Sequence, residues 1–192
     1  MTIQTLGVIG AGQMGSGIAQ VAAANGLTVV MNDIKPEFVQ RGLATIDRIL
    51  ARSVEKGKMS AEEKATMLKR IQTSVDLKDM STADFVVEAA TENEPLKCQI
   101  FRSLDEFCQP HVVLATNTSS IPIGRIASQT GRPEKVIGMH FMNPVPLMKL
   151  VEVIRGIATS DETFKLTWDL ALKFDKTPAE SNDYPGFIAN RI

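Results

Sequence analysis

Residues 6–15 read LGVIGAGQMG, a short apolar segment followed by three glycines in the pattern G-x-G-x-x-G. Gly10 can adopt a backbone conformation that a residue with a Cβ atom resists. Gly12 leaves room for a pyrophosphate to approach the backbone, and Gly15 lets a helix pack closely against a strand. A helical pattern follows, and the apolar residues 27–31 predict a second strand. This context predicts a dinucleotide-binding turn, and the alternative is a plain strand–turn–helix.

Asp33 lies at the end of the second predicted strand, 21 residues beyond Gly12. A ribose-binding acid is expected roughly 20 residues after such a turn. Its carboxylate can accept hydrogen bonds from both hydroxyls of an adenine ribose and would repel a 2′-phosphate, so we predict NAD rather than NADP as the cofactor. Lys35 is the nearby cation that could weaken this repulsion. The alternative is a solvated aspartate in a turn.

The composition limits the class of protein. The chain has 192 residues, 44% of them hydrophobic, and a formal charge of −1, which predicts one domain with a substantial core. The near-neutral charge gives no overall attraction to nucleic acid or membranes, and no apolar run is long enough to span a bilayer. The N-terminus has no signal-peptide pattern, and Cys98 and Cys108 lack metal-site spacing. We therefore expect a cytoplasmic protein with reduced cysteines and no metal.

Strand patterns alternate with helical patterns along the chain. A strand, a helix and a strand fill residues 5–32, and further strands are predicted at 71–73, 84–90, 112–116, 136–140 and 150–154, with an edge strand at 178–181. Helices are predicted at 36–56, 60–70, 94–108, 123–127 and 161–174, and residues 74–81 are expected to be turn and loop. This alternation favours an α/β fold with a Rossmann-type, doubly wound, mainly parallel sheet.

The helices predicted between residues 41 and 70 carry an excess of basic side chains, eight against four acidic ones. Such an excess is usually a solvated face. The functional alternative is a binding surface for a polyphosphate outside the cofactor cleft.

Polar residues gather after the later strands, where open α/β sheets bind ligands. They are Ser119, His140, Asn143 and Glu152. His140 ends an apolar strand and could simply be a core histidine. Glu152 lies within another apolar strand, where a carboxylate costs free energy unless it is paired. Pairing of Glu152 with His140 would fix the imidazole tautomer and leave the other ring nitrogen free to exchange a proton.

Six motifs resemble the 3-hydroxyacyl-CoA dehydrogenase family, with the nearest likeness to its bacterial 3-hydroxybutyryl-CoA members. They are GAGQMG at 10–15, VEAATEN at 87–93, NTSS at 117–120, GMHFMNPVP at 138–146, LVEVIR at 150–155 and PGFIANR at 185–191. The resemblance extends from Leu6 to Ile192. It implies NAD-dependent oxidation of (S)-3-hydroxyacyl-CoA, such as 3-hydroxybutyryl-CoA, to 3-oxoacyl-CoA, or the reverse.

The resemblance also implies residue roles. His140 matches the catalytic histidine that takes the 3-hydroxyl proton, and Glu152 matches its carboxylate partner. Ser119 and Asn190 match catalytic residues that hydrogen-bond substrate oxygens. The cofactor set is Gly10, Gly12, Gln13, Met14, Gly15, Asp33, Glu92, Lys97, Asn117, Ser119 and Asn143. Within this set, Glu92, Lys97, Asn117 and Asn143 match groups near the nicotinamide end of the cofactor. The substrate set is Ser119, Asn143 and Asn190, with Arg52 and Lys56 for the 3′-phospho-ADP of coenzyme A.

The family architecture implies a division of the chain. Residues 1–184 are expected to form the NAD-binding domain and residues 185–192 the start of a helical domain that is otherwise absent. A helix beginning at Pro185 would have little to pack against, so this tail is expected to be mobile or to contact another chain. The family implies a homodimer for the longer protein. Two alternatives stay open: an NAD(H)-binding fragment without turnover, and a dehydrogenase of a hydroxy acid not linked to coenzyme A.

Overall fold

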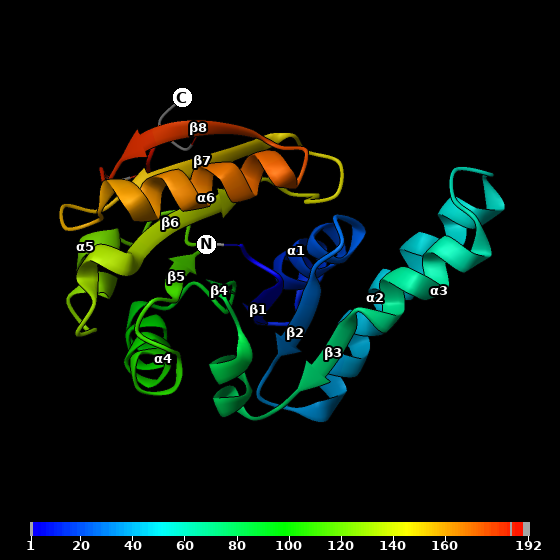
Figure 1. Ribbon diagram of the computed structural model, residues 1–192, viewed down its shortest axis with the longest axis horizontal. Helices are drawn as coiled ribbons and strands as arrows, with labels where there is room; N and C mark the ends of the chain where they lie inside the picture. The colour runs from blue at the N-terminus through cyan, green and yellow to red at the C-terminus, as the bar shows by residue number, and fades with distance from the viewer. Residues whose placement is uncertain (1, 185, 190–192) are drawn as a thin grey trace.

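The computed structural model describes residues 2–184 and 186–189, and in it one eight-stranded sheet forms the centre of the fold (Figure 1). The strand order is β3-β2-β1-β4-β5-β6-β7-β8. The strands are β1 (Thr5–Ile9), β2 (Thr28–Asn32), β3 (Ile71–Ser74), β4 (Phe85–Glu88), β5 (Val113–Thr116), β6 (Val136–Phe141), β7 (Leu150–Arg155) and β8 (Thr177–Asn182).

The chain runs outward from β1 through β2 to β3 and then returns to the other side of β1 as β4. The topological switch point therefore lies between β1 and β4. Among the six strands β1 to β6, every neighbouring pair is parallel. The carboxyl ends of these strands therefore lie at the same edge of the sheet. Ligands of open α/β sheets bind in the crevice at that edge.

The sheet reverses direction once. β7 is antiparallel to β6, and the predicted edge strand, β8, is parallel to β7. Only residues 142–149 connect β6 to β7, whereas a parallel crossover needs a dozen or more residues. The helix between β7 and β8 supplies that length, so these two strands run in the same direction. The predicted mainly parallel sheet is confirmed.

Helices cover both faces of the sheet (Figure 1). One apolar cluster contains residues of α1 (Gln13–Ala24), α2 (Pro36–Glu55), α3 (Ala61–Lys69) and α6 (Asp161–Lys173). The other contains residues of α4 (Glu94–Phe107), α5 (Ile123–Ala127) and the 3₁₀ helix η1 (Leu77–Thr82). A second 3₁₀ helix, η2 (Pro133–Lys135), precedes β6. The fold is thus doubly wound, as predicted. In the described residues, no helix has the length and apolar character needed to cross a membrane.

Two local predictions are wrong. The segment 74–81, expected to be turn and loop, contains most of η1, which begins when the Asp76 side chain accepts the Lys78 N–H. The segment after Pro185, expected to begin a helix, forms turns over residues 186–189. Those turns are also anchored rather than free of the domain, because Phe187 is 2% exposed and packs in the second apolar cluster.

Candidate functional site

The glycine turn joins β1 to α1 at the switch point. Gly10 has φ 95°, and a Cβ atom there would lie 2.5 Å from the Ala89 carbonyl oxygen. A Cβ on Gly15 would lie 1.7 Å from the Gly10 oxygen, so strand and helix can meet this closely only at glycine. A Cβ on Gly12 would contact nothing within 4 Å. Gly12 therefore borders open space just before the N-terminus of α1, where backbone N–H groups favour an anion.

Asp33 is tied to this turn. Its Oδ2 accepts the Ala11 N–H at 2.8 Å, and its Oδ1 accepts the Ile34 N–H at 2.8 Å. Nearby Lys35 instead lies 4.0 Å from Glu37. The carboxylate is therefore a fixed part of the turn, which disfavours the alternative of a merely solvated aspartate.

A cavity of about 350 Å³ opens beside Asp33 and the glycine turn. Its wall includes the exposed apolar side chains Ile34, Val75 and Leu96. A flat aromatic group could pack among such side chains while a sugar hydroxyl reached the carboxylate. The residues present thus fit the adenosine half of a dinucleotide, with the pyrophosphate at Gly12.

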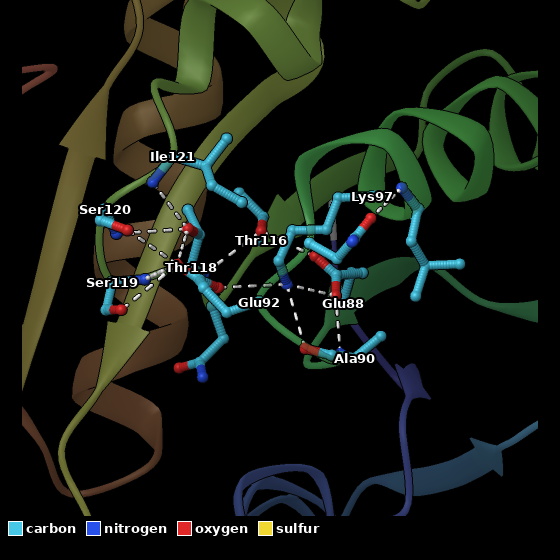
Figure 2. Close-up of polar contacts among 12 residues, drawn as sticks. Glu88, Ala90, Glu92, Lys97, Thr116, Thr118, Ser119, Ser120 and Ile121 are labelled. Carbon is cyan, nitrogen blue, oxygen red and sulfur yellow. Dashed lines mark hydrogen bonds and ion pairs between the residues drawn. The ribbon is translucent and has the colours of Figure 1, made fainter.

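A buried ion pair joins Lys97 of α4 to Glu88 of β4 (Figure 2). Lys97 Nζ donates to Glu88 Oε1 at 2.7 Å and to the Ala90 carbonyl at 3.2 Å, and both charged side chains are at most 1% exposed. Thr116 donates to Glu88 Oε2 at 2.7 Å, and the Ala90 N–H donates to Oε1 at 2.6 Å. The sequence analysis missed Glu88, although a carboxylate within a predicted apolar strand is the same signal that pointed to Glu152.

Glu92 extends this network to the loop after β5 (Figure 2). Its Oε1 accepts hydrogen bonds from Thr118 Oγ1 at 2.6 Å, from the Ser119 N–H at 3.0 Å and from Ser120 Oγ at 3.2 Å, and its Oε2 is 3.7 Å from Lys97 Nζ. Burial opposes ionisation, but these hydrogen bonds and the Lys97 charge outweigh it and hold the Glu92 pKa below its usual 4.5. Glu92 therefore links Lys97 to Ser119, two residues assigned to the site.

His140 and Glu152 are brought together by the β6–β7 pairing, where they are directly opposed. His140 Nδ1 lies 2.7 Å from Glu152 Oε2, and both side chains are nearly buried. Glu152 Oε1 accepts the N–H groups of Ile188 and Ala189, each at 2.8 Å. The Phe187 ring centroid lies 6.1 Å from the His140 ring centroid. Both carboxylate oxygens are therefore occupied, and the imidazole is held in one orientation.

The segment after β8 is also held at its start. Asp183 accepts the N–H of Ile123 at 2.8 Å and that of Gly124 at 2.8 Å, both at the beginning of α5. Together with the contacts to Glu152, this holds Asp183 and residues 187–189 on the domain. Asn190 lies outside the described residues, so its predicted role stays a prediction.

Two asparagines of the site lie at the carboxyl ends of β5 and β6. Asn117 Oδ1 accepts the Phe141 N–H at 2.8 Å and ties these ends together. Asn143 is exposed and lines a second cavity, of about 310 Å³, together with Gly12 and Gln13. Met14 is half-buried and packs against the core.

The predicted coenzyme A residues lie apart from these cavities. Arg52 and Lys56 are exposed at the end of α2 and line neither the 350 Å³ nor the 310 Å³ cavity. Arg41, at the other end of α2, does line the cavity beside Gly12 and was not singled out from the sequence. Helical periodicity predicts that Arg41, Arg52 and Lys56 lie on one helix. It does not predict which turn of that helix lies beside the cavity.

Comparisons with known proteins show which family the chain belongs to. A family profile described as 3-hydroxyacyl-CoA dehydrogenase, NAD binding domain, matches residues 5–184. The chain is 53% identical to a probable 3-hydroxybutyryl-CoA dehydrogenase of Bacillus subtilis, over all of this chain and 67% of that protein. It is 50% identical to the 3-hydroxybutyryl-CoA dehydrogenase of Bradyrhizobium diazoefficiens, over 99% of this chain and 65% of that protein.

Among solved structures, that of (S)-3-hydroxybutyryl-CoA dehydrogenase from Ralstonia eutropha matches with a TM-score of 0.97 and 46% identity, covering all of this chain and 68% of that one. The chain thus spans about two thirds of the length of these relatives. The remaining third of each has no counterpart in the 192 residues. From the profile, the relatives and the glycine turn together, the chain belongs to the 3-hydroxyacyl-CoA dehydrogenase family of NAD-dependent oxidoreductases and contains its NAD-binding domain.

Proposed function

We propose that this chain takes part in the NAD-dependent oxidation of (S)-3-hydroxyacyl-CoA, with 3-hydroxybutyryl-CoA as the substrate, or in the reverse reduction. The observation that carries the proposal is the 2.7 Å contact between His140 Nδ1 and Glu152 Oε2 at the edge of the sheet where the glycine turn lies. When bound, NAD supplies the acceptor for the hydride from C3 of the substrate. The residues of the chain bind and orient the reactants and accept the proton.

The proton acceptor in this proposal is His140. An ionised carboxylate can only accept hydrogen bonds, so the contact with Glu152 favours the tautomer that carries its proton on Nδ1. His140 Nε2 then takes the 3-hydroxyl proton during oxidation and returns it during reduction. Glu152 also balances the positive charge that His140 acquires.

The remaining site residues have supporting roles. Ser119, Asn143 and Asn190 would bind substrate oxygens. Gly10, Gly12, Gln13, Met14, Gly15 and Asp33, with Glu92, Lys97, Asn117, Ser119 and Asn143, would hold the cofactor. Arg52 and Lys56 would bind the coenzyme A nucleotide at a distance from the reaction, which can help to position a small acyl group.

We further propose residues 1–184 as the cofactor domain and 185–192 as the start of a second domain. A homodimer in the cytoplasm without a nucleic acid partner is the proposed setting. Two free cysteines, Cys98 and Cys108, fit a reducing compartment, and the formal charge of −1 offers little attraction to nucleic acid.

The test is NADH oxidation followed by absorbance, with acetoacetyl-CoA and free acetoacetate compared as substrates. Faster turnover of the coenzyme A ester supports the proposal. Equal rates would favour the dehydrogenase of a free hydroxy acid. NADH binding without turnover would favour the cofactor-binding fragment, a reading motivated by the third of the relatives that this chain does not match.

A further inference from the structure

Lys176 is a buried lysine outside the site described above. It lies between α6 and β8 and is 7% exposed. Its Nζ atom donates to the Val145 carbonyl at 2.5 Å and to the Met148 carbonyl at 2.9 Å. Burial lowers the Lys176 pKa from 10.5, and the charge of Lys149 lowers it further. A buried ammonium therefore holds two carbonyl groups of the loop between β6 and β7.

That loop, residues 142–149, reaches the cofactor cleft. Val145 is buried against α1, where a Cβ atom on Gly17 would lie 2.8 Å from the Val145 Cβ atom. The loop runs beside α1 in the fold (Figure 1). Asn143 and Val145 line the 310 Å³ cavity that faces Gly12. The position of the loop thus determines the distance between Asn143 and the glycine turn.

A second lysine joins the same two segments at the surface. Lys149, at the end of the loop, pairs with the Asp175 carboxylate and donates to the Asp175 carbonyl at 3.1 Å. Both side chains of this pair are more than half exposed, and exposed ion pairs contribute only about 0–1 kcal/mol. The buried hydrogen bonds of Lys176 are charge-assisted and shielded from water, so they are the stronger constraint on the loop.

We propose that Lys176 is a positioning residue that fixes residues 142–149, and through them Asn143, for the nicotinamide half of the cofactor. The inference rests on the proposed function, because Asn143 is assigned to that half by resemblance. Lys176 itself touches neither reactant in this proposal. Its loss should therefore affect one end of the dinucleotide and leave the adenosine end at Asp33 unchanged.

The test compares NADH with ADP-ribose, which lacks the nicotinamide. Affinities of the 192-residue chain are measured by fluorescence titration with NADH and by competition with ADP-ribose. Lys176→Met keeps most of the length of the side chain but removes the charged donor. It should weaken NADH binding about tenfold, because part of the binding free energy is then used to order the released loop, and change ADP-ribose binding less than about twofold. Lys149→Met, the matched control, should change neither affinity.

Lys176→Arg, which retains charge and donors, should restore most of the NADH affinity. If Lys176→Met does not fold, Lys176→Gln is tested in its place. It should cause a smaller loss of NADH affinity and no loss of ADP-ribose affinity. Equal losses for NADH and ADP-ribose, or no loss for either, would overturn the proposal. Failure of the unmodified chain to bind NADH would instead refute the proposed function, so the two failures are distinguishable.

Discussion

His140 and Glu152 are directly opposed on the antiparallel strands β6 and β7, with His140 Nδ1 2.7 Å from Glu152 Oε2. Cross-strand partners on one face of a sheet have neighbouring Cβ atoms, so the backbone itself brings the pair together. The second carboxylate oxygen is held by the Ile188 and Ala189 N–H groups. The orientation of the imidazole therefore depends on the sheet and on the segment after β8.

His140→Gln should lower turnover of acetoacetyl-CoA about 10²–10⁴-fold, the usual contribution of a general acid–base group. Glu152→Gln should cause a loss of similar order, because an amide N–H facing Nδ1 would favour the tautomer that protonates Nε2. Steady-state rates and NADH titrations measure these effects. NADH affinity should stay near that of the unmodified chain, and near-normal turnover of His140→Gln would remove it from the proposed role.

Asp33→Ala should reduce NADH affinity by roughly 1.5–3 kcal/mol, since hydrogen bonds to a charged group are lost. NADPH affinity should fall less or rise, because the carboxylate that repels the 2′-phosphate is gone. Titration of both cofactors gives the ratio directly. Lys69→Met serves as the control at an exposed cation that lines neither the 350 Å³ nor the 310 Å³ cavity. Unchanged discrimination between the two cofactors would argue against a ribose contact.

Lys97→Met should destabilise the fold by about 3–5 kcal/mol, because it leaves the Glu88 carboxylate buried and unpaired. The double variant Glu88→Gln with Lys97→Met should recover part of this loss, since no uncompensated charge then remains. Urea unfolding of both single variants and the double variant measures the coupling. Additive losses would show that the two side chains act independently.

Glu92 makes stability depend on pH in a defined direction. Its pKa is lower in the folded state than its usual 4.5, so the anion favours the folded state. This contribution is present above pH 4.5 and is lost as the pH falls through the folded pKa. Glu92→Gln should therefore flatten the acid side of the stability curve, measured by urea unfolding between neutral pH and about pH 3. An unchanged slope would contradict the expectation.

Phe187→Ala should destabilise the fold by about 3–5 kcal/mol, the range for removing a buried aromatic ring. Ile188→Ala is the control, because Ile188 is 45% exposed and its backbone N–H remains. Its effect should stay within about 0.5 kcal/mol. A small loss for Phe187→Ala would mean that the segment after β8 contributes little to the domain.

Much of the fold could be predicted because the hydrophobic periodicity of the segments and the turn residues between them indicate the same elements. The glycine turn, the helix predicted at 60–70 and the edge strand β8 are all confirmed. The pairing of His140 with Glu152 could be inferred because a carboxylate within an apolar strand needs a partner. Glu88 is also a carboxylate within an apolar strand, but its partner Lys97 lies on a helix. The sequence does not show which lysine of a helix points into the core.

Other features depend on backbone geometry that the residue types do not predict. Phe187 has φ 49°, a conformation uncommon for a residue with a side chain, and this turn presents the next two N–H groups to Glu152. The antiparallel direction of β7 could have been predicted, because the eight-residue connection from β6 is too short for a parallel crossover. The position of the loop 142–149 rests on a lysine more than 25 residues away, which local patterns do not reveal.

The hydrogen bonds from Ile188 and Ala189 to Glu152 also have a mechanical meaning. The segment after β8 therefore donates two hydrogen bonds to the same carboxylate that contacts His140. A shift of residues 188 and 189 would therefore move the Glu152 carboxylate and, through it, the His140 ring. With His140 as the proposed base, a movement of the segment after β8 would change the orientation of that base from outside the cofactor cleft.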